Sequence, residues 1–170
     1  MASSGTALAP IPQTNQPALE QKLKLQSRMR SGAGWILAVS IFSVINSALV
    51  FFDAKLHFIV GLGITQIVDG VAHHVSSKGS IAGIVVSAFV AGLFLLFWKF
   101  AREGQQWAFI VAMALYAMDA LIFLVLGIML EFGFHVFALY CMYKGLSALN
   151  ALDKLNNQDA TRTIAPVVAR

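Results

Sequence analysis

The sequence predicts an all-α membrane protein, a polytopic helix bundle of about five transmembrane helices. Of its 170 residues, 58% are hydrophobic and 12% are charged, whereas soluble domains average roughly 45–50% apolar and about 25% charged residues. The apolar runs are also long enough, because one crossing needs about 20 residues and residues 107–130 contain a single charged side chain, Asp119. We therefore expect an integral protein of a plasma membrane or bacterial inner membrane.

The chain before the first apolar run divides into two segments. Residues 1–16 are small and polar and contain proline, which predicts a flexible tail, and they lack the basic-then-apolar order of a cleavable signal peptide. Residues 17–31 form a basic amphipathic juxtamembrane segment, with Leu19, Leu23 and Met29 at helical spacing. Its basic residues are Lys22, Lys24, Arg28 and Arg30. Such a segment either lies on an anionic leaflet or extends into solvent as a helix.

A transmembrane bundle is expected over residues 32–150, followed by a polar C-terminal tail over residues 151–170. The predicted spans are 33–52, 56–76, 80–100, 107–130 and 132–150. Tryptophans lie near three predicted span ends, where amphipathic rings prefer the interface; they are Trp35, Trp98 and Trp107. In the third span, Gly83, Ser87 and Ala91 recur every four residues, which predicts close helix packing and a surface for self-association.

A faint internal repeat relates the first and fourth spans. "GAGW" opens the first span and "GQQW" opens the fourth, and a polar residue follows each tryptophan, at Asn46 and at Asp119. Each span then turns through a carboxylate followed four residues later by histidine, at Asp53 and at Glu131. Because one span separates them, the two hairpins would flank a central helix and run in opposite directions, as inverted repeats do in transporters. The alternative is chance similarity between apolar helices.

Charge gives the expected topology. The basic residues before the first span favour a cytoplasmic N-terminus. With five spans, Lys99 and Arg102 would face the opposite side, so either the bias is weak or one segment does not cross. The net charge of +4 concerns lipid headgroups and topology, and no basic-aromatic pattern indicates nucleic acid. The only cysteine, Cys141, can form no intrachain disulfide and is expected to be a small buried hydrophobe.

Asp119 needs a partner, because an isolated charge at the bilayer centre costs roughly 2.5–3.5 kcal/mol. If the last two spans turn near Glu131, Asp119 and Lys144 lie about twelve residues on either side of the turn, at one depth. This geometry predicts an Asp119–Lys144 pair, and Asn46 with Gln66 as a neutral counterpart in the first hairpin. Such residues either fix the register of helices or form an ion or proton site.

A second candidate site combines imidazoles and carboxylates on one side of the five-span arrangement. Its residues are Asp69, His73, His74, Glu131 and His135. Asp69 and His73 are four residues apart, as are Glu131 and His135, so each pair shares one helix face. These ligand types suit zinc or iron, but no HExxH or cysteine-based zinc motif accompanies them. The alternative is that the histidines are ordinary interfacial residues.

Three functions fit this sequence. The favoured one is a structural or accessory membrane subunit, in contact with the lipid bilayer and assembled as a homo-oligomer or in a larger membrane complex, because nothing in the chain demands enzymatic chemistry or a cofactor. The second is a small transporter or ion-translocating protein with a midplane site at Asp119 and Lys144. The third is a membrane metalloenzyme that uses the two carboxylate–histidine pairs.

Overall fold

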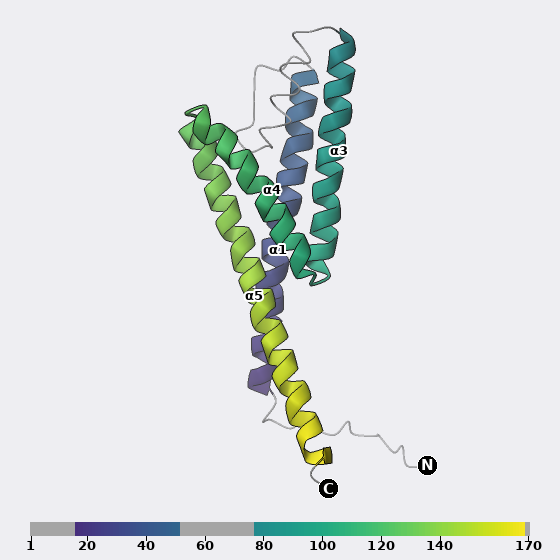
Figure 1. Cartoon of the computed structure of the whole chain (residues 1–170), viewed down its shortest axis with the longest axis vertical. Coiled ribbons are helices and arrows are strands. Elements are labelled where there is room, and N and C mark those ends of the chain that lie inside the picture. Colours follow the sequence, from purple (N-terminus) through teal and green to yellow (C-terminus); the bar gives the residue numbers. More distant parts are fainter. Residues whose placement is uncertain (1–15, 52–76, 169–170) are drawn as a thin grey trace, which may run out of the picture.

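The computed structural model describes residues 16–51 and 77–168, which form four α-helices (Figure 1). They are α1 (Gln16–Phe51), α3 (Ser77–Arg102), α4 (Gln106–Val125) and α5 (Met129–Val168). The prediction of an all-α helix bundle is therefore confirmed. The second predicted span, 56–76, lies outside the described residues.

The four helices alternate in direction along the described chain. α1 and α4 run the same way, and α3 and α5 run antiparallel to both (Figure 1). α1 ends and α3 begins at the same end of the bundle, whereas the prediction assumed one net crossing between them. An inverted repeat requires the first and fourth spans to point in opposite directions, so that part of the fold prediction is wrong.

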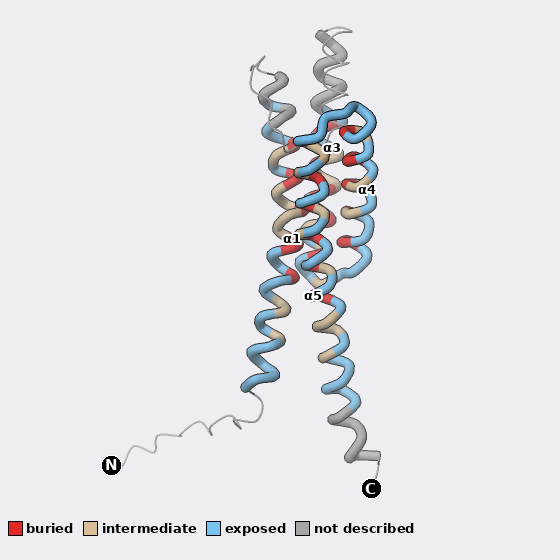
Figure 2. Tube along the Cα trace, turned by 90° about the vertical axis from the view of Figure 1, so that its left-hand side faces the viewer, coloured by how far each residue is buried: buried red, intermediate tan, exposed pale blue. Residues whose placement is uncertain are grey.

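The described residues form a four-helix bundle and a two-helix stalk. In the bundle, α1 packs against α3 and α5, and α4 packs against α3 and α5. Beyond it, residues 16–25 of α1 and 153–168 of α5 continue in antiparallel directions and diverge from each other (Figures 1 and 2), and we call these two segments the stalk. Buried residues are concentrated in the bundle, and the stalk is mostly exposed (Figure 2). Lys22 Nζ lies 2.6 Å from Asp159 Oδ2 across the stalk.

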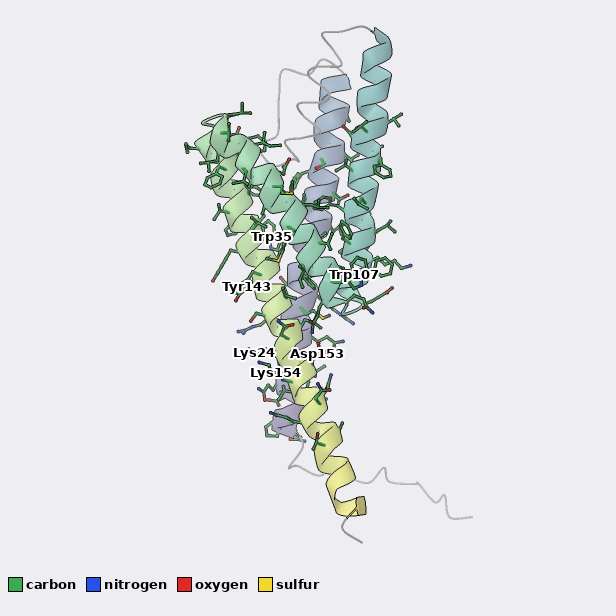
Figure 3. All side chains as sticks on the ribbon, viewed as in Figure 1. Lys24, Trp35, Trp107, Tyr143, Asp153 and Lys154 are labelled. Atoms are coloured by element: carbon green, nitrogen blue, oxygen red, sulfur yellow. The ribbon has the colours of Figure 1, made fainter. Side chains whose placement is uncertain are left out.

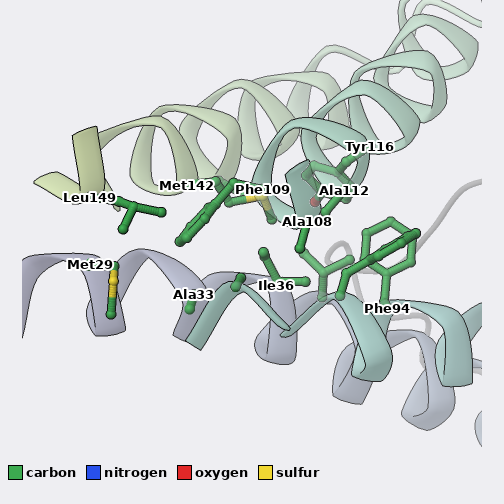
Figure 4. Close-up of a cluster of buried hydrophobic side chains, with 14 of the residues drawn as sticks. Met29, Ala33, Ile36, Phe94, Ala108, Phe109, Ala112, Tyr116, Met142 and Leu149 are labelled. Atoms are coloured by element: carbon green, nitrogen blue, oxygen red, sulfur yellow. The ribbon is translucent and has the colours of Figure 1, made fainter. Parts of the chain in front are cut away.

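The bundle core combines large and small side chains (Figure 4). Its largest fully buried hydrophobic side chains are Ile36, Phe94, Phe109, Tyr116 and Met142. Alanines interleave with them, so that the backbones of neighbouring helices can approach; they include Ala33, Ala108, Ala112 and Ala138. A buried hydrogen bond joins α1 to α3, because Ser40 Oγ donates to the carbonyl oxygen of Ala91 at 2.7 Å.

The backbones of α1 and α5 touch at Gly32 and Gly145. A Cβ atom added to Gly145 would lie 2.7 Å from Gly32 Cα and 3.1 Å from Phe109 Cε1. A Cβ atom added to Gly32 would lie 2.8 Å from the backbone nitrogen of Gly145. Ordinary carbon contacts begin at about 3.5 Å, so only glycine fits at either position with the helices this close.

The turn between α4 and α5 is built around Gly127. This residue has φ +73°, a left-handed conformation that glycine adopts without steric cost. Its N–H donates to the carbonyl oxygen of Leu124, and the N–H of Ile128 donates to that of Phe123. This pair of bonds is the Schellman arrangement that closes many helices. The turn therefore lies at 126–128, four to five residues before the predicted position at Glu131.

Among the helices that the structure describes, two are long and apolar enough to cross a membrane. They are Val85–Arg102 within α3, with mean hydropathy 1.7, and Gln106–Val125, which is α4, with mean hydropathy 2.4. Length and hydropathy alone are weak evidence, because a buried core helix of a soluble protein meets the same criterion. Many large apolar side chains on these helices are exposed, however, including Phe89 at 72%, Met118 at 66% and Val125 at 85%.

Candidate functional site

One face of α4 presents three buried side chains to α5. Tyr116, Asp119 and Phe123 are spaced at i, i+3 and i+7, which places them on one side of the helix. Opposite them is His135, in the second turn of α5. An aspartate flanked by two aromatic rings therefore meets a histidine at the α4–α5 contact.

The Asp119 carboxyl group and the His135 imidazole form a buried pair. His135 Nε2 lies 3.0 Å from Asp119 Oδ2, and the side chains are 0% and 4% exposed, respectively. His135 Nδ1 lies 2.8 Å from the main-chain carbonyl oxygen of Glu131. Burying an ionisable group is costly unless it is paired and hydrogen-bonded, and this geometry meets both conditions for the imidazole.

The hydrogen-bond pattern fixes how many protons the pair holds. A carbonyl oxygen can only accept, so His135 Nδ1 carries a hydrogen and donates it to Glu131. Nε2 then either accepts from a protonated Asp119 or, as part of an imidazolium, donates to the Asp119 carboxylate. In both forms the pair has zero net charge, and a single proton lies between Oδ2 and Nε2.

Two aromatic rings of α4 contact the imidazole. The Tyr116 ring is stacked on His135 with centroids 4.4 Å apart and planes at 18°, and the Phe123 ring lies at 4.8 Å and 43°. Phe94 of α3 meets the outer edge of Tyr116, with ring centroids 6.5 Å apart. Within the described part of the chain, the buried Tyr116 hydroxyl makes no hydrogen bond. The imidazole is thus held rigidly, with one polar group of its surroundings still available to a ligand or water.

Asp119 also borders a groove between α3 and α4. The groove has a volume of about 330 Å³. Apart from Asp119, its lining is apolar, with Val90, Leu93 and Phe94 from α3 and Leu115, Met118 and Ile122 from α4. The carboxyl group therefore connects the buried histidine with an apolar groove.

The predicted Asp119–Lys144 pair is wrong. Because the turn is at Gly127, Asp119 lies eight residues before it and His135 eight residues after it, at the same level. Lys144 is nine residues farther along α5, about 13.5 Å at 1.5 Å per residue. Its Nζ is exposed and lies 5.5 Å from the centroid of the Tyr140 ring. The glycine in "LVLGIML" is the helix-stop signal that would have located the turn and the true partner.

The predicted metal ligands are only partly described. Asp69, His73 and His74 lie outside the described residues, as does Gln66. Glu131 contacts His135 through its main-chain carbonyl oxygen, and the two imidazole nitrogens lie at hydrogen-bond distance from that oxygen and from Asp119 Oδ2. Among residues 16–51 and 77–168, no three His, Cys, Asp or Glu side chains gather as a metal site would require.

The remaining predicted positions lie on α1 and α3. Asn46 belongs to α1, but its side chain is outside the described part of the structure. Gly83 belongs to α3, and Ser87 and Ala91 of the same helix are buried, with Ala91 bonded to Ser40 of α1. This part of the small-residue stripe is therefore occupied by contacts inside one chain.

Comparison with known proteins found no similar protein. No family model matches the chain, and neither a curated protein nor a solved structure shows significant similarity to it.

Proposed function

We propose that this chain is a small multi-pass integral membrane protein that acts as a structural or accessory membrane subunit. The observation that carries the proposal is the apolar outer surface of the bundle, to which all four described helices contribute. Exposed members of this surface are Ile41, Val44, Phe89, Leu96, Ile110, Met118, Leu121, Val125 and Phe137. Monomeric soluble proteins rarely expose large apolar patches, and membranes or partner proteins normally cover such patches.

The aromatic residues support a membrane boundary near the base of the bundle. Trp107 and Tyr143 are both exposed and lie at a similar height, above the charged Lys24 and Asp153 of the stalk (Figure 3). Arg102 lies over the Trp98 ring at 5.5 Å. Tryptophan, tyrosine and basic residues collect at the membrane–water interface, because their apolar parts enter lipid while their polar ends remain hydrated.

The same geometry supports an orientation with the stalk in the cytoplasm. Basic residues gather at the stalk end; they are Lys22, Lys24, Arg28, Arg30, Lys99, Arg102, Lys154 and Arg162. At the opposite end, the described helices carry Lys78. Because α3 ends beside the base of α1, Lys99 and Arg102 join the N-terminal basic residues on one side. The conflict that a five-span arrangement creates with the positive-inside rule is thereby removed.

The polar interior of the bundle favours a structural role. Asp119 and His135 link α4 to α5, and Ser40 links α1 to α3. Buried polar groups used in this way fix the register of neighbouring helices. These buried polar groups hold the helices of the bundle together. The protein would then contact other membrane components through its apolar outer surface and its stalk.

Membrane insertion and association are tested separately. We expect the protein to remain in the membrane pellet after alkaline carbonate extraction, and release into the supernatant would overturn the membrane assignment. In a Cys141→Ala background, Lys24→Cys should react with an impermeant maleimide from the cytoplasmic face only. After purification in mild detergent, we expect a defined oligomer or a co-purifying membrane protein. A homogeneous monomer without a partner would contradict the accessory role.

A second function, proton or ion translocation, is favoured by one specific observation. Asp119 and His135 share a single proton, and Asp119 also borders the groove between α3 and α4. Intramembrane ionisable residues are functional candidates by default. Proteoliposomes with a pH-sensitive dye test this function, with Asp119→Asn as the variant. Proton flux that is absent from the wild type, or equal in the variant, would leave the pair with its structural role.

A further inference from the structure

We propose that a second site, between α1 and α5 at the base of the bundle, binds the phosphate group of an anionic lipid. The site is a pocket of about 160 Å³. It is lined by Arg28, Ser31, Gly32 and Trp35 from α1 and by Cys141 and Lys144 from α5.

The pocket exists because of the glycine contact between the two helices. At Gly32 the α1 backbone touches the α5 backbone at Gly145, so the helices diverge on either side of this point. The glycine has no side chain to fill the resulting hollow, and the long side chains of Arg28 and Lys144 surround it from opposite helices. Its volume is about five times the ~30 Å³ that one water molecule occupies in the liquid. A phosphate group with part of its hydration shell therefore fits.

The polar groups that line the pocket are mainly donors. The Arg28 guanidinium, the Lys144 ammonium and the Trp35 indole N–H donate only, and the Ser31 hydroxyl can donate. No carboxylate is among the lining residues. Within the described part of the chain, neither Arg28 nor Lys144 forms an ion pair. Two uncompensated cations from different helices, one of them a planar guanidinium, match the charge and geometry of phosphate oxygens.

The height of the pocket in the bundle indicates which phosphate it takes. Trp35 and Tyr143 lie near the level of Trp107, at the boundary inferred above (Figure 3). Basic pockets between helices at the cytoplasmic face are suited to acidic lipid headgroups. The choice of a lipid therefore rests on the proposed membrane function, whereas a chain in water would offer the same donors to a soluble phosphate.

The test is binding to delipidated protein in detergent, with short-chain dihexanoyl phosphatidic acid and inorganic phosphate as separate probes. Native mass spectrometry counts bound lipid, and titration calorimetry gives both affinities. The variant is Arg28→Gln with Lys144→Gln, and the control is Arg30→Gln, an exposed basic residue of α1 that does not line the pocket. Because Arg28 and Lys144 are exposed, their replacement should leave helicity and unfolding unchanged.

We expect the wild type and the Arg30→Gln control to bind phosphatidic acid equally. The double variant should bind it at least about tenfold more weakly, because it loses two charge-assisted hydrogen bonds to the phosphate group. Equal binding by the double variant, or binding of neither probe by the wild type, would overturn the proposal. Binding of inorganic phosphate as tightly as the lipid, lost in the same variant, would support the phosphate site and reject a lipid as its source. Carbonate extraction of the same preparation reports separately on membrane insertion.

Discussion

Replacing Gly145 by alanine should destabilise the protein through a clash between two helix backbones. The new Cβ atom would lie 2.7 Å from Gly32 Cα, 3.1 Å from Phe109 Cε1 and 3.3 Å from the carbonyl carbon of Gly32. Contact at about 3.5 Å requires α1 and α5 to separate locally by roughly 0.8 Å. Two of the three contacted atoms belong to the backbone, so a rotation of one side chain cannot relieve the overlap.

The magnitude follows from comparison with a glycine that has space around it. Gly133 is also in α5, and among the described residues nothing lies within 4 Å of a Cβ atom added there. In both variants the change from glycine to alanine favours the helix by about 0.5–1 kcal/mol, so this contribution cancels in their difference. Overpacking a close contact costs typically about 1–3 kcal/mol. Gly145→Ala should therefore be about 1–3 kcal/mol less stable than Gly133→Ala.

Reversible unfolding in mixed detergent micelles, followed by circular dichroism, measures both free energies of unfolding. Gly32→Ala provides a second measurement, because its Cβ atom would lie 2.8 Å from the backbone nitrogen of Gly145. If Gly145→Ala and Gly32→Ala proved as stable as Gly133→Ala, α1 and α5 would not touch at these glycines. The origin assigned to the neighbouring phosphate pocket would then fail as well.

Three further predictions concern the polar contacts. Asp119→Asn should be as stable as the wild type, because the amide N–H can donate to His135 Nε2. Asp119→Ala leaves that nitrogen without a hydrogen-bond partner and should lower the free energy of unfolding by about 1–3 kcal/mol. Equal free energies of unfolding for Asp119→Ala and the wild type would contradict the Asp119–His135 pair. Nitrogen NMR of labelled histidine should show a hydrogen on His135 Nδ1, and a neutral ring with its hydrogen on Nε2 would refute the proton assignment. Lys22→Ala should lower the free energy of unfolding by less than about 1 kcal/mol, and by less still in high salt, because water reaches both side chains of its ion pair. A larger, salt-independent loss would show that the stalk is more tightly packed.

Helix formation could be predicted from the sequence because it depends on local properties. In a membrane, the backbone N–H and C=O groups of a long apolar run must hydrogen-bond to one another, and an α-helix pairs nearly all of them. The basic segment before the first run has helical periodicity of its own, and α1 is indeed one helix from Gln16 to Phe51. That it pairs with the C-terminal part of α5 depends on residues more than a hundred positions away, and periodicity carries no such information.

The partner of Asp119 depended on the position of one turn. A need for a buried partner follows from the cost of an isolated charge, and that reasoning led to α5. The choice between Lys144 and His135 required the turn to be placed within a few residues, because each residue shifts the opposing position along the hairpin by one place. Gly127 determines it by its left-handed conformation. The prediction placed the turn at Glu131, between the spans 107–130 and 132–150, whereas the glycine at 127 is a local signal for the end of a helix.

The α4–α5 turn has a consequence for how the protein enters a membrane. Its exposed side chains are apolar through the whole tip, from Leu124 to Leu130, and the N–H groups of Leu126, Gly127 and Ile128 bond within the chain. The side chains from Leu124 to Leu130 add no charged group that must lose its water before the tip crosses hydrocarbon. Within the membrane function proposed above, α4 and α5 can therefore insert together as one hairpin, led by the tip, with the Asp119–His135 pair already closed and neutral.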